Sequence, residues 1–312
     1  MKIATTTADF EEYVARDDAA GAIRLLAKCG FRHVDLSMDT AFFDGSAMCS
    51  DNWREWAEGI RRAAAESGVD LVQAHASNGC YDPGPERERR IAMLKRELEI
   101  CRILGIPGMV LHGISRPKIS REEFMQANVR FYRELLPTAE KTGVRIYTEN
   151  TCRQNCPTYY LYEGADLHEL RRLLDDHPLF GFCWDVGHAN CHGTDQYESI
   201  MAMGGGLMAV HIHDNNFGYD MHLAPFTGTT SYDAVISGLL EVGFKGYFTL
   251  EAYSIPVPHT FCFCPRKHFT RNGQASEKLM MLPLEFKLRS ETLMLDIAKY
   301  MLNTLAPVTY NL

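Results

Sequence analysis

Three short apolar runs in the second half of the chain each end on a side chain that can bind a divalent cation. The residues that follow these runs are Asp185, His211 and Glu251. Carboxylate and imidazole groups are frequent ligands of divalent metals in proteins. A parallel barrel gathers the C-terminal ends of its strands at one mouth. We therefore expect these three side chains to meet around one ion.

The same pattern occurs three times earlier in the chain. Apolar runs there end at His75, His112 and Glu149. A single His or Glu after a strand is usually a hydrogen-bonding residue. Six consecutive strand ends that all carry ligand-type residues instead indicate a metal site.

Strand-like and helix-like segments alternate along the chain. The predicted strands are 2–6, 33–37, 69–75, 108–112, 144–149, 180–185, 207–213 and 246–251. Amphipathic segments predict helices at 19–29, 52–67, 86–104, 121–142, 165–175 and 232–242. Five helices run into a glycine that suits a C-terminal cap, namely Gly30, Gly68, Gly105, Gly143 and Gly243. Eight strands with helices between them predict an α/β fold, a (β/α)8 TIM barrel.

The chain is expected to form one domain over residues 1–312, because α/β barrels exceed 250 residues as single domains. Residues 254–283 break the alternation and are rich in proline, aromatic and basic residues. We predict an insertion after the eighth strand that covers the barrel mouth as a lid, with surface packing or an oligomer contact as alternatives. A final helix is expected at about 284–302.

Composition limits the classes of partner. The hydrophobic content of 46% and charged content of 23% are ordinary for a globular protein, and the net charge of −8 disfavours nucleic acid as a partner. No apolar stretch approaches the ~20 residues of a membrane span, and no signal-peptide pattern begins the chain. The ten cysteines follow neither a disulfide framework nor a zinc-finger spacing. We therefore expect a cytoplasmic protein with reduced cysteines.

The motifs at the strand ends resemble those of the xylose-isomerase-like superfamily of TIM barrels. They are Glu149-Asn150-Thr151, Asp185-x-x-His188, His211-x-x-Asp214, Asp220-x-His222 and Glu251. The superfamily contains sugar and sugar-phosphate isomerases and epimerases, inosose-processing enzymes and endonuclease-IV-type apurinic endonucleases. The resemblance extends over residues 2–252 and the last helix.

This resemblance implies a metal-dependent isomerase or epimerase that acts on a sugar or a sugar phosphate. The implied ion is Mn²⁺, Zn²⁺ or Mg²⁺, and its ligands are Glu149, Asp185, His211 and Glu251. Such an ion would stabilise the enediolate that forms when the α-carbon of the substrate loses its proton. In the epimerase branch, carboxylates matching Glu149 and Glu251 also exchange protons on opposite faces of the substrate. His188 matches an imidazole that binds substrate.

An apurinic/apyrimidinic endonuclease of the endonuclease-IV type, with a trinuclear zinc site, stays open as the alternative. The further ligands of that zinc site would match His75, His112, His188, Asp220 and His222. If the protein is an isomerase or epimerase, the same five residues are expected to bind substrate or an additional metal. Other positions disfavour this alternative. Met221 stands where that family has Arg, and residues 76–80 lack its DNA-contacting Tyr.

A non-catalytic sugar-binding barrel is the third alternative. Residues 215–219 lack the Arg with which the best-known ketose 3-epimerases hold their sugar, so the identity of the sugar stays open. A homo-oligomer also stays open, because barrels of this type often pair. Two nearby residues are expected outside the site: Trp184 beside the barrel interior, and His213 pointing away from His211.

Overall fold

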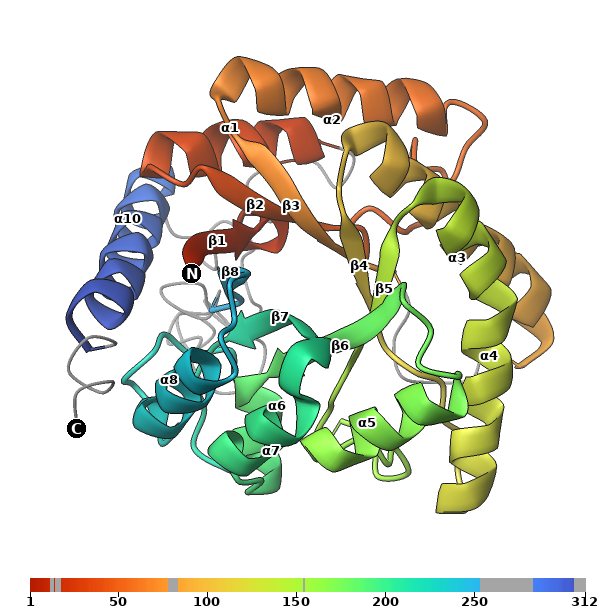
Figure 1. Ribbon diagram of the computed structural model, residues 1–312. Coiled ribbons are helices and arrows are strands. Elements are labelled where there is room, and N and C mark those ends of the chain that lie inside the picture. The colour runs from red at the N-terminus through yellow and green to blue at the C-terminus, as the bar shows by residue number, and fades with distance from the viewer. Residues whose placement is uncertain (12–13, 15–17, 78–83, 154, 253–282, 306–312) are drawn as a thin grey trace, which may run out of the picture.

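The computed structural model describes residues 1–11, 14, 18–77, 84–153, 155–252 and 283–305. Eight parallel strands pair in sequence order and close into a barrel (Figure 1). The strands are β1 (Lys2–Thr6), β2 (His33–Ser37), β3 (Asp70–His75), β4 (Gly108–Leu111), β5 (Arg145–Glu149), β6 (Phe180–Asp185), β7 (Leu207–Ile212) and β8 (Tyr247–Leu250). The predicted (β/α)8 TIM barrel is confirmed.

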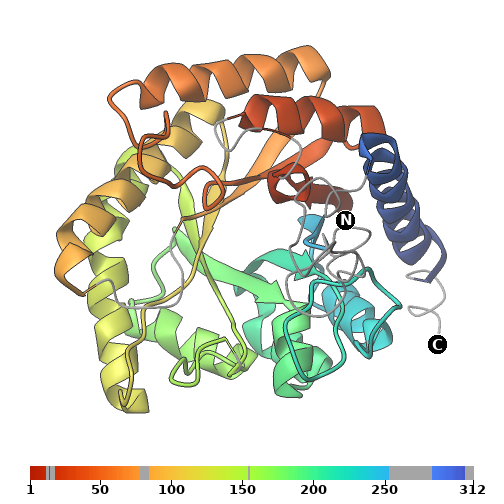
Figure 2. The ribbon, with the colours of Figure 1, turned by 180° about the vertical axis from the view of Figure 1, so that it is seen from behind.

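Helices surround the barrel, and α10 lies beside α1 (Figures 1 and 2). The helices are α1 (Ala19–Cys29), α2 (Trp53–Ser67), α3 (Arg87–Leu104), α4 (Arg121–Thr142), α5 (Gly164–Leu173), α6 (Val186–His192), α7 (Gln196–Met203), α8 (Tyr232–Glu241) and α10 (Leu284–Tyr300). Shorter turns are η1 (Thr7–Phe10), η2 (Gly84–Glu86), η3 (Gly204–Gly206) and the π-helical η5 (Met301–Leu305). Within the described residues, no helix has the length and apolar character needed to cross a membrane.

Local chemistry explains where several helices begin and end. Ser120 and Glu123 form a reciprocal capping box at the start of α4. Four of the predicted glycines cap the helices before them in the left-handed conformation, which a residue without Cβ adopts at little cost. These are Gly30, Gly68, Gly105 and Gly143.

The barrel interior contains a small apolar layer directly beneath the mouth. This layer consists of Val110, Tyr147, Cys183 and Ala209. Two residues further along each of these segments come His112, Glu149, Asp185 and His211. Residues two apart on a strand face the same side of the sheet. The four polar side chains therefore point into the barrel above the apolar layer.

The register of pairing between β2 and β3 shifts by one residue after Val34. Val34 pairs with Leu71, but the next residue, Asp35, pairs with Gln73. A bulge of this kind redirects the side chains that follow it. Leu71 accordingly packs in the outer core between strands and helices, whereas Gln73 makes contacts in the barrel interior.

The C-terminal part of the chain is described only in part. Residues 253–282, which include nearly all of the predicted insertion 254–283, lie outside the described residues. The helix expected at 284–302 is present as α10. The single-domain organisation and the lid stay predictions.

A buried glutamate anchors the segment that follows β3. The side chain of Glu97, on α3, is fully buried and accepts hydrogen bonds from the backbone N–H and the hydroxyl of Ser77. Burial raises the pKa of Glu97 from 4.5 to about 7, although the bonds from Ser77 and the charge of Arg90 act in the opposite direction. Between about pH 4.5 and pH 7, the folded chain therefore holds a proton on Glu97 that the unfolded chain releases.

We expect Glu97→Gln to flatten the dependence of stability on pH. A raised pKa stabilises the fold fully below pH 4.5, and this contribution is lost as pH rises through about 7. The total change should be roughly 3 kcal/mol in the free energy of unfolding. Urea denaturation between pH 4 and pH 8 measures it, with the exposed Glu88→Gln on the same helix as control. Parallel curves for wild type and Glu97→Gln would contradict the assignment.

Candidate metal centre

Three carboxylates surround one ring nitrogen at the centre of the mouth. His211 Nδ1 lies 2.7 Å from Glu149 Oε1, 3.6 Å from Glu251 Oε1 and 3.9 Å from Asp185 Oδ2. These groups come from the ends of β5, β6 and β7 and from the residue after β8. The four residues predicted to share an ion thus have donor atoms directed at a common region.

Two carboxylates of this group are buried and have histidines, but no Lys or Arg among the described residues, as partners. Glu149 and Asp185 are 1% and 0% exposed, and among the described residues neither forms an ion pair with Lys or Arg. Burial acts to raise the pKa of Glu149, but the charges of His211 and His112 outweigh it and hold the pKa well below 4.5. Buried anions require compensation by cationic groups. Here imidazoles provide it, and a divalent cation would fit the same surroundings.

Two further histidines contact the second oxygen of Glu149. His75 Nε2 lies 3.3 Å and His112 Nε2 3.2 Å from Glu149 Oε2. Burial lowers the pKa of His112 to about 4. Burial also acts to lower the pKa of His75, but its bond to Glu149 prevails and raises it to about 9. Both predicted residues therefore lie at the mouth, and their pKa values are shifted in opposite directions.

A second group of ligand-type residues lies beside the first. Asp220 Oδ2 is 3.1 Å from His188 Nε2 and 3.3 Å from His222 Nε2. Asp220 Oδ1 is buried and has no hydrogen-bond partner among the described residues. The ligand atoms of these three residues lie within 4.8 Å of one another, as do those of Glu149, Asp185 and His188. The two groups therefore adjoin through His188.

Backbone contacts explain the Asp-x-x-His spacing. Asp185 ends β6 and is also the N-cap of α6, where its Oδ1 accepts the N–H of His188 at 2.6 Å. An N-cap side chain reaches the N–H three residues ahead, so the capping geometry sets the spacing. The Asn150 amide holds Asp185 from the other side: it donates to the Asp185 carbonyl at 2.9 Å and accepts the Asp185 N–H at 2.7 Å.

The prediction that His213 points away from the site is wrong. His213 Nε2 lies 3.0 Å from Asp185 Oδ2, and its ring stacks on His222 with 3.9 Å between centroids. Residues two apart share a face, so the alternation of the strand itself places His213 on the side of His211. Trp184, in contrast, is buried in the outer core and donates to Gln196 on α7 at 2.8 Å.

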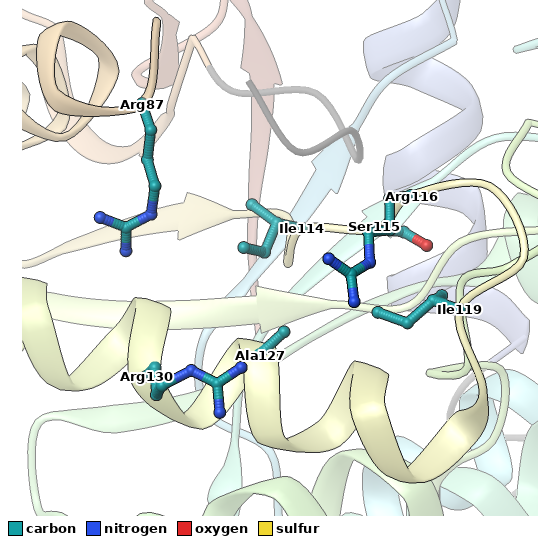
Figure 3. A pocket seen from close by; sticks show the side chains of 7 residues that line it. All are labelled: Arg87, Ile114, Ser115, Arg116, Ile119, Ala127 and Arg130. Carbon is teal, nitrogen blue, oxygen red and sulfur yellow. The ribbon is translucent and has the colours of Figure 1, made fainter. Parts of the chain in front are cut away.

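A separate cavity is lined by the segment that follows His112 and by residues of α3 and α4. Figure 3 shows three arginines from three different segments around Ile114. They are Arg87, Arg116 and Arg130. Arg87 donates to Glu134 at 2.7 Å. None of the candidate ligands lines this cavity, so it is distinct from the metal centre.

Several known proteins are similar in sequence to parts of the chain. An uncharacterized protein, y4fM, of Sinorhizobium fredii is 24% identical over 259 residues, which cover 74% of this chain and 79% of that protein. A probable endonuclease 4 of Thermotoga sp. is 30% identical over 161 residues, 50% of this chain and 52% of the relative. Inosose isomerase of Bacillus subtilis is 26% identical over 170 residues, 52% of this chain and 60% of the relative. The chain thus spans only about half the length of these two enzymes.

Solved structures of sugar epimerases share the fold over nearly the whole chain. D-psicose 3-epimerase of Clostridium cellulolyticum H10, solved with D-tagatose, superposes with a TM-score of 0.70 at 18% identity and covers 97% of this chain and 99% of its own. The sequence model of one family, described as xylose isomerase-like TIM barrel, matches residues 23–280. This chain therefore belongs to the xylose isomerase-like TIM barrel family.

Proposed function

We propose that this protein is a divalent-metal-dependent isomerase or epimerase of a sugar or sugar phosphate. The observation that carries the proposal is the approach of Glu149 and Glu251 to the same nitrogen of His211, at 2.7 and 3.6 Å. The names of the inosose isomerase and D-psicose 3-epimerase relatives support the substrate class.

Glu149, Asp185, His211 and Glu251 would hold the ion. Three carboxylates and one imidazole suit Mn²⁺, Mg²⁺ or Zn²⁺. The buried, unpartnered oxygen of Asp220 is a further sign that this mouth is built for a cation. When bound, a divalent cation polarises a substrate carbonyl and its neighbouring hydroxyl and lowers the cost of removing the proton between them.

The two glutamates would perform the proton transfers. They approach from β5 and from the end of β8, which are separated in the barrel by β6 and β7. One carboxylate takes the proton from the carbon beside the carbonyl, and the other returns a proton to the opposite face. The electron pair stays on the substrate, so the reaction needs no redox partner. His75, His112 and His188 line the same mouth and would bind substrate hydroxyls.

An endonuclease is the second candidate, and one observation favours it. His188, Asp220 and His222 form a ligand-type group beside the first, which would allow further metal ions. The name of the Thermotoga relative, probable endonuclease 4, also supports an endonuclease. This function would require a trinuclear zinc site and a surface that accepts DNA, whereas the net charge of the chain is −8.

Metal analysis and solvent exchange on the full-length protein separate the candidates. We expect about one ion per chain, and metal-dependent incorporation of deuterium from D₂O at the α-carbon of one sugar in a panel of free and phosphorylated ketoses and inososes. Chelation should abolish the exchange, and reloading should restore it. About three zinc ions with cleavage of abasic DNA would instead support the endonuclease. Sugar binding without turnover would support a sensing barrel.

A further inference from the structure

A buried polar pair occupies the barrel interior on the side of β2 and β3. Asp35 and Gln73 are 0% and 3% exposed, and they are register partners because of the bulge in this strand pair. Barrel interiors are usually filled by branched apolar side chains. Burying a carboxylate and an amide costs free energy unless they are well hydrogen-bonded, so packing alone does not account for this pair.

The Gln73 amide connects Asp35 to the central histidine. Gln73 Nε2 lies 2.5 Å from Asp35 Oδ2 and 2.8 Å from His211 Nε2. The other ring nitrogen, Nδ1, faces the carboxylates of Glu149, Glu251 and Asp185. The ring of His211 therefore has one end toward the candidate ion and the other toward Gln73.

In His211, the position of the ring proton at Nε2 decides whether Nδ1 is free to bind a cation. A neutral imidazole that binds a cation through Nδ1 carries its proton on Nε2, and this N–H needs an acceptor. Gln73 can accept only through its amide oxygen. In the structure the NH₂ group lies at the terminus that faces both His211 and Asp35, so acceptance from His211 requires the amide turned by about 180°, which exchanges NH₂ and oxygen. An ionised Asp35 requires the NH₂ group at that terminus, whereas a protonated Asp35 allows the oxygen to accept from both neighbours.

We propose that Gln73, held by Asp35, is a positioning residue that places the proton of His211 on Nε2 and thereby prepares Nδ1 to bind the ion. This inference rests on the proposed function, because it assumes an ion at His211. It also assigns a role to a buried polar pair that lies behind His211.

The surroundings of Asp35 are consistent with a protonated carboxyl. Burial raises the pKa of Asp35 to about 6; among the charged groups that face it, Glu251 acts in the same direction and His211 and His75 oppose it. Asp35 Oδ1 has no hydrogen-bond partner among the described residues. The neutral form is therefore accessible close to neutral pH.

Titration of the full-length protein with Mn²⁺ by calorimetry tests the inference. Gln73→Met keeps the volume and removes the amide, and we expect it to weaken Mn²⁺ binding about 10- to 100-fold. Asp35→Asn mimics the protonated acid, because its NH₂ group donates to the Gln73 oxygen. We expect this variant to bind Mn²⁺ as tightly as wild type or more tightly. Gln126→Leu, on the exposed face of α4, is the control and should not differ from wild type.

The two variants separate positioning from general support of the fold. A purely structural role would make Gln73→Met and Asp35→Asn weaken binding to a similar degree. That outcome, or a Gln73→Met variant within about 3-fold of wild type, overturns the inference while the proposed ion stands. Wild-type protein that binds none of Mn²⁺, Zn²⁺ and Mg²⁺ overturns the proposed function and this inference together. Thermal denaturation of each variant shows whether it is folded, and Gln73→Leu replaces Gln73→Met if that variant is not.

Discussion

Glu149→Gln and Glu251→Gln should each lower kcat by about 10²- to 10⁴-fold, the usual range for the loss of a general acid or base. Each substitution also removes a negative charge beside His211 Nδ1. Neither side chain belongs to the apolar layer of the barrel, so the fold should persist. Exchange of the substrate α-hydrogen with D₂O measures the effect directly.

A matched control for this experiment is Glu241→Gln. Glu241 is an exposed residue at the end of α8, where it accepts a hydrogen bond from Tyr197 at 2.7 Å. Its replacement should leave the exchange rate unchanged. Undiminished exchange in Glu149→Gln or in Glu251→Gln would exclude the proposed role of that residue. Circular dichroism of each variant separates lost chemistry from lost structure.

Gly187→Ala should disrupt the site through a steric clash. A Cβ at Gly187 would lie 1.8 Å from His213 Cε1 and 2.2 Å from His213 Nδ1. The His213 ring is fully buried and stacked on His222, so it has little room to move. Overpacking of this kind usually costs 1–3 kcal/mol. We expect a loss of this size in the free energy of unfolding, together with weaker Mn²⁺ binding as His213 leaves Asp185.

Gly205→Ala provides the matched control for this clash. A Cβ at Gly205 would have no neighbour within 4 Å, and this glycine does not have a positive φ. Its stability should stay within about 0.5 kcal/mol of wild type. A Gly187→Ala variant that equals wild type in stability and Mn²⁺ affinity would contradict the described packing of His213.

The barrel could be predicted from the sequence because its signals are local. Apolar runs, amphipathic segments and glycine caps recur in order, and the predicted strand ends match the observed ones within one residue. Helices α6 and α7 were not predicted. Six of the seven residues of α6 are buried, so the segment has no polar face and no amphipathic period. A short helix buried on all sides resembles a loop with apolar residues in the sequence.

The candidate site was predictable to the extent that it depends on strand ends. The proximity of Glu149, Asp185, His211 and Glu251 follows from the barrel topology, and their role as ligands stays a prediction. The contacts behind them could not be predicted. Asp35 meets Gln73 only because the register shifts between Val34 and Asp35, and a register shift leaves no mark in the pattern of apolar residues.

The most direct test of the shared ion is a crystal structure of the full chain grown with Mn²⁺, with anomalous data collected at the manganese edge. The account predicts one anomalous peak, with donor atoms of Glu149, Asp185, His211 and Glu251 at about 2.0–2.6 Å from it. A peak bound by other residues, with Glu149 and Glu251 directed into separate pockets, would contradict the account.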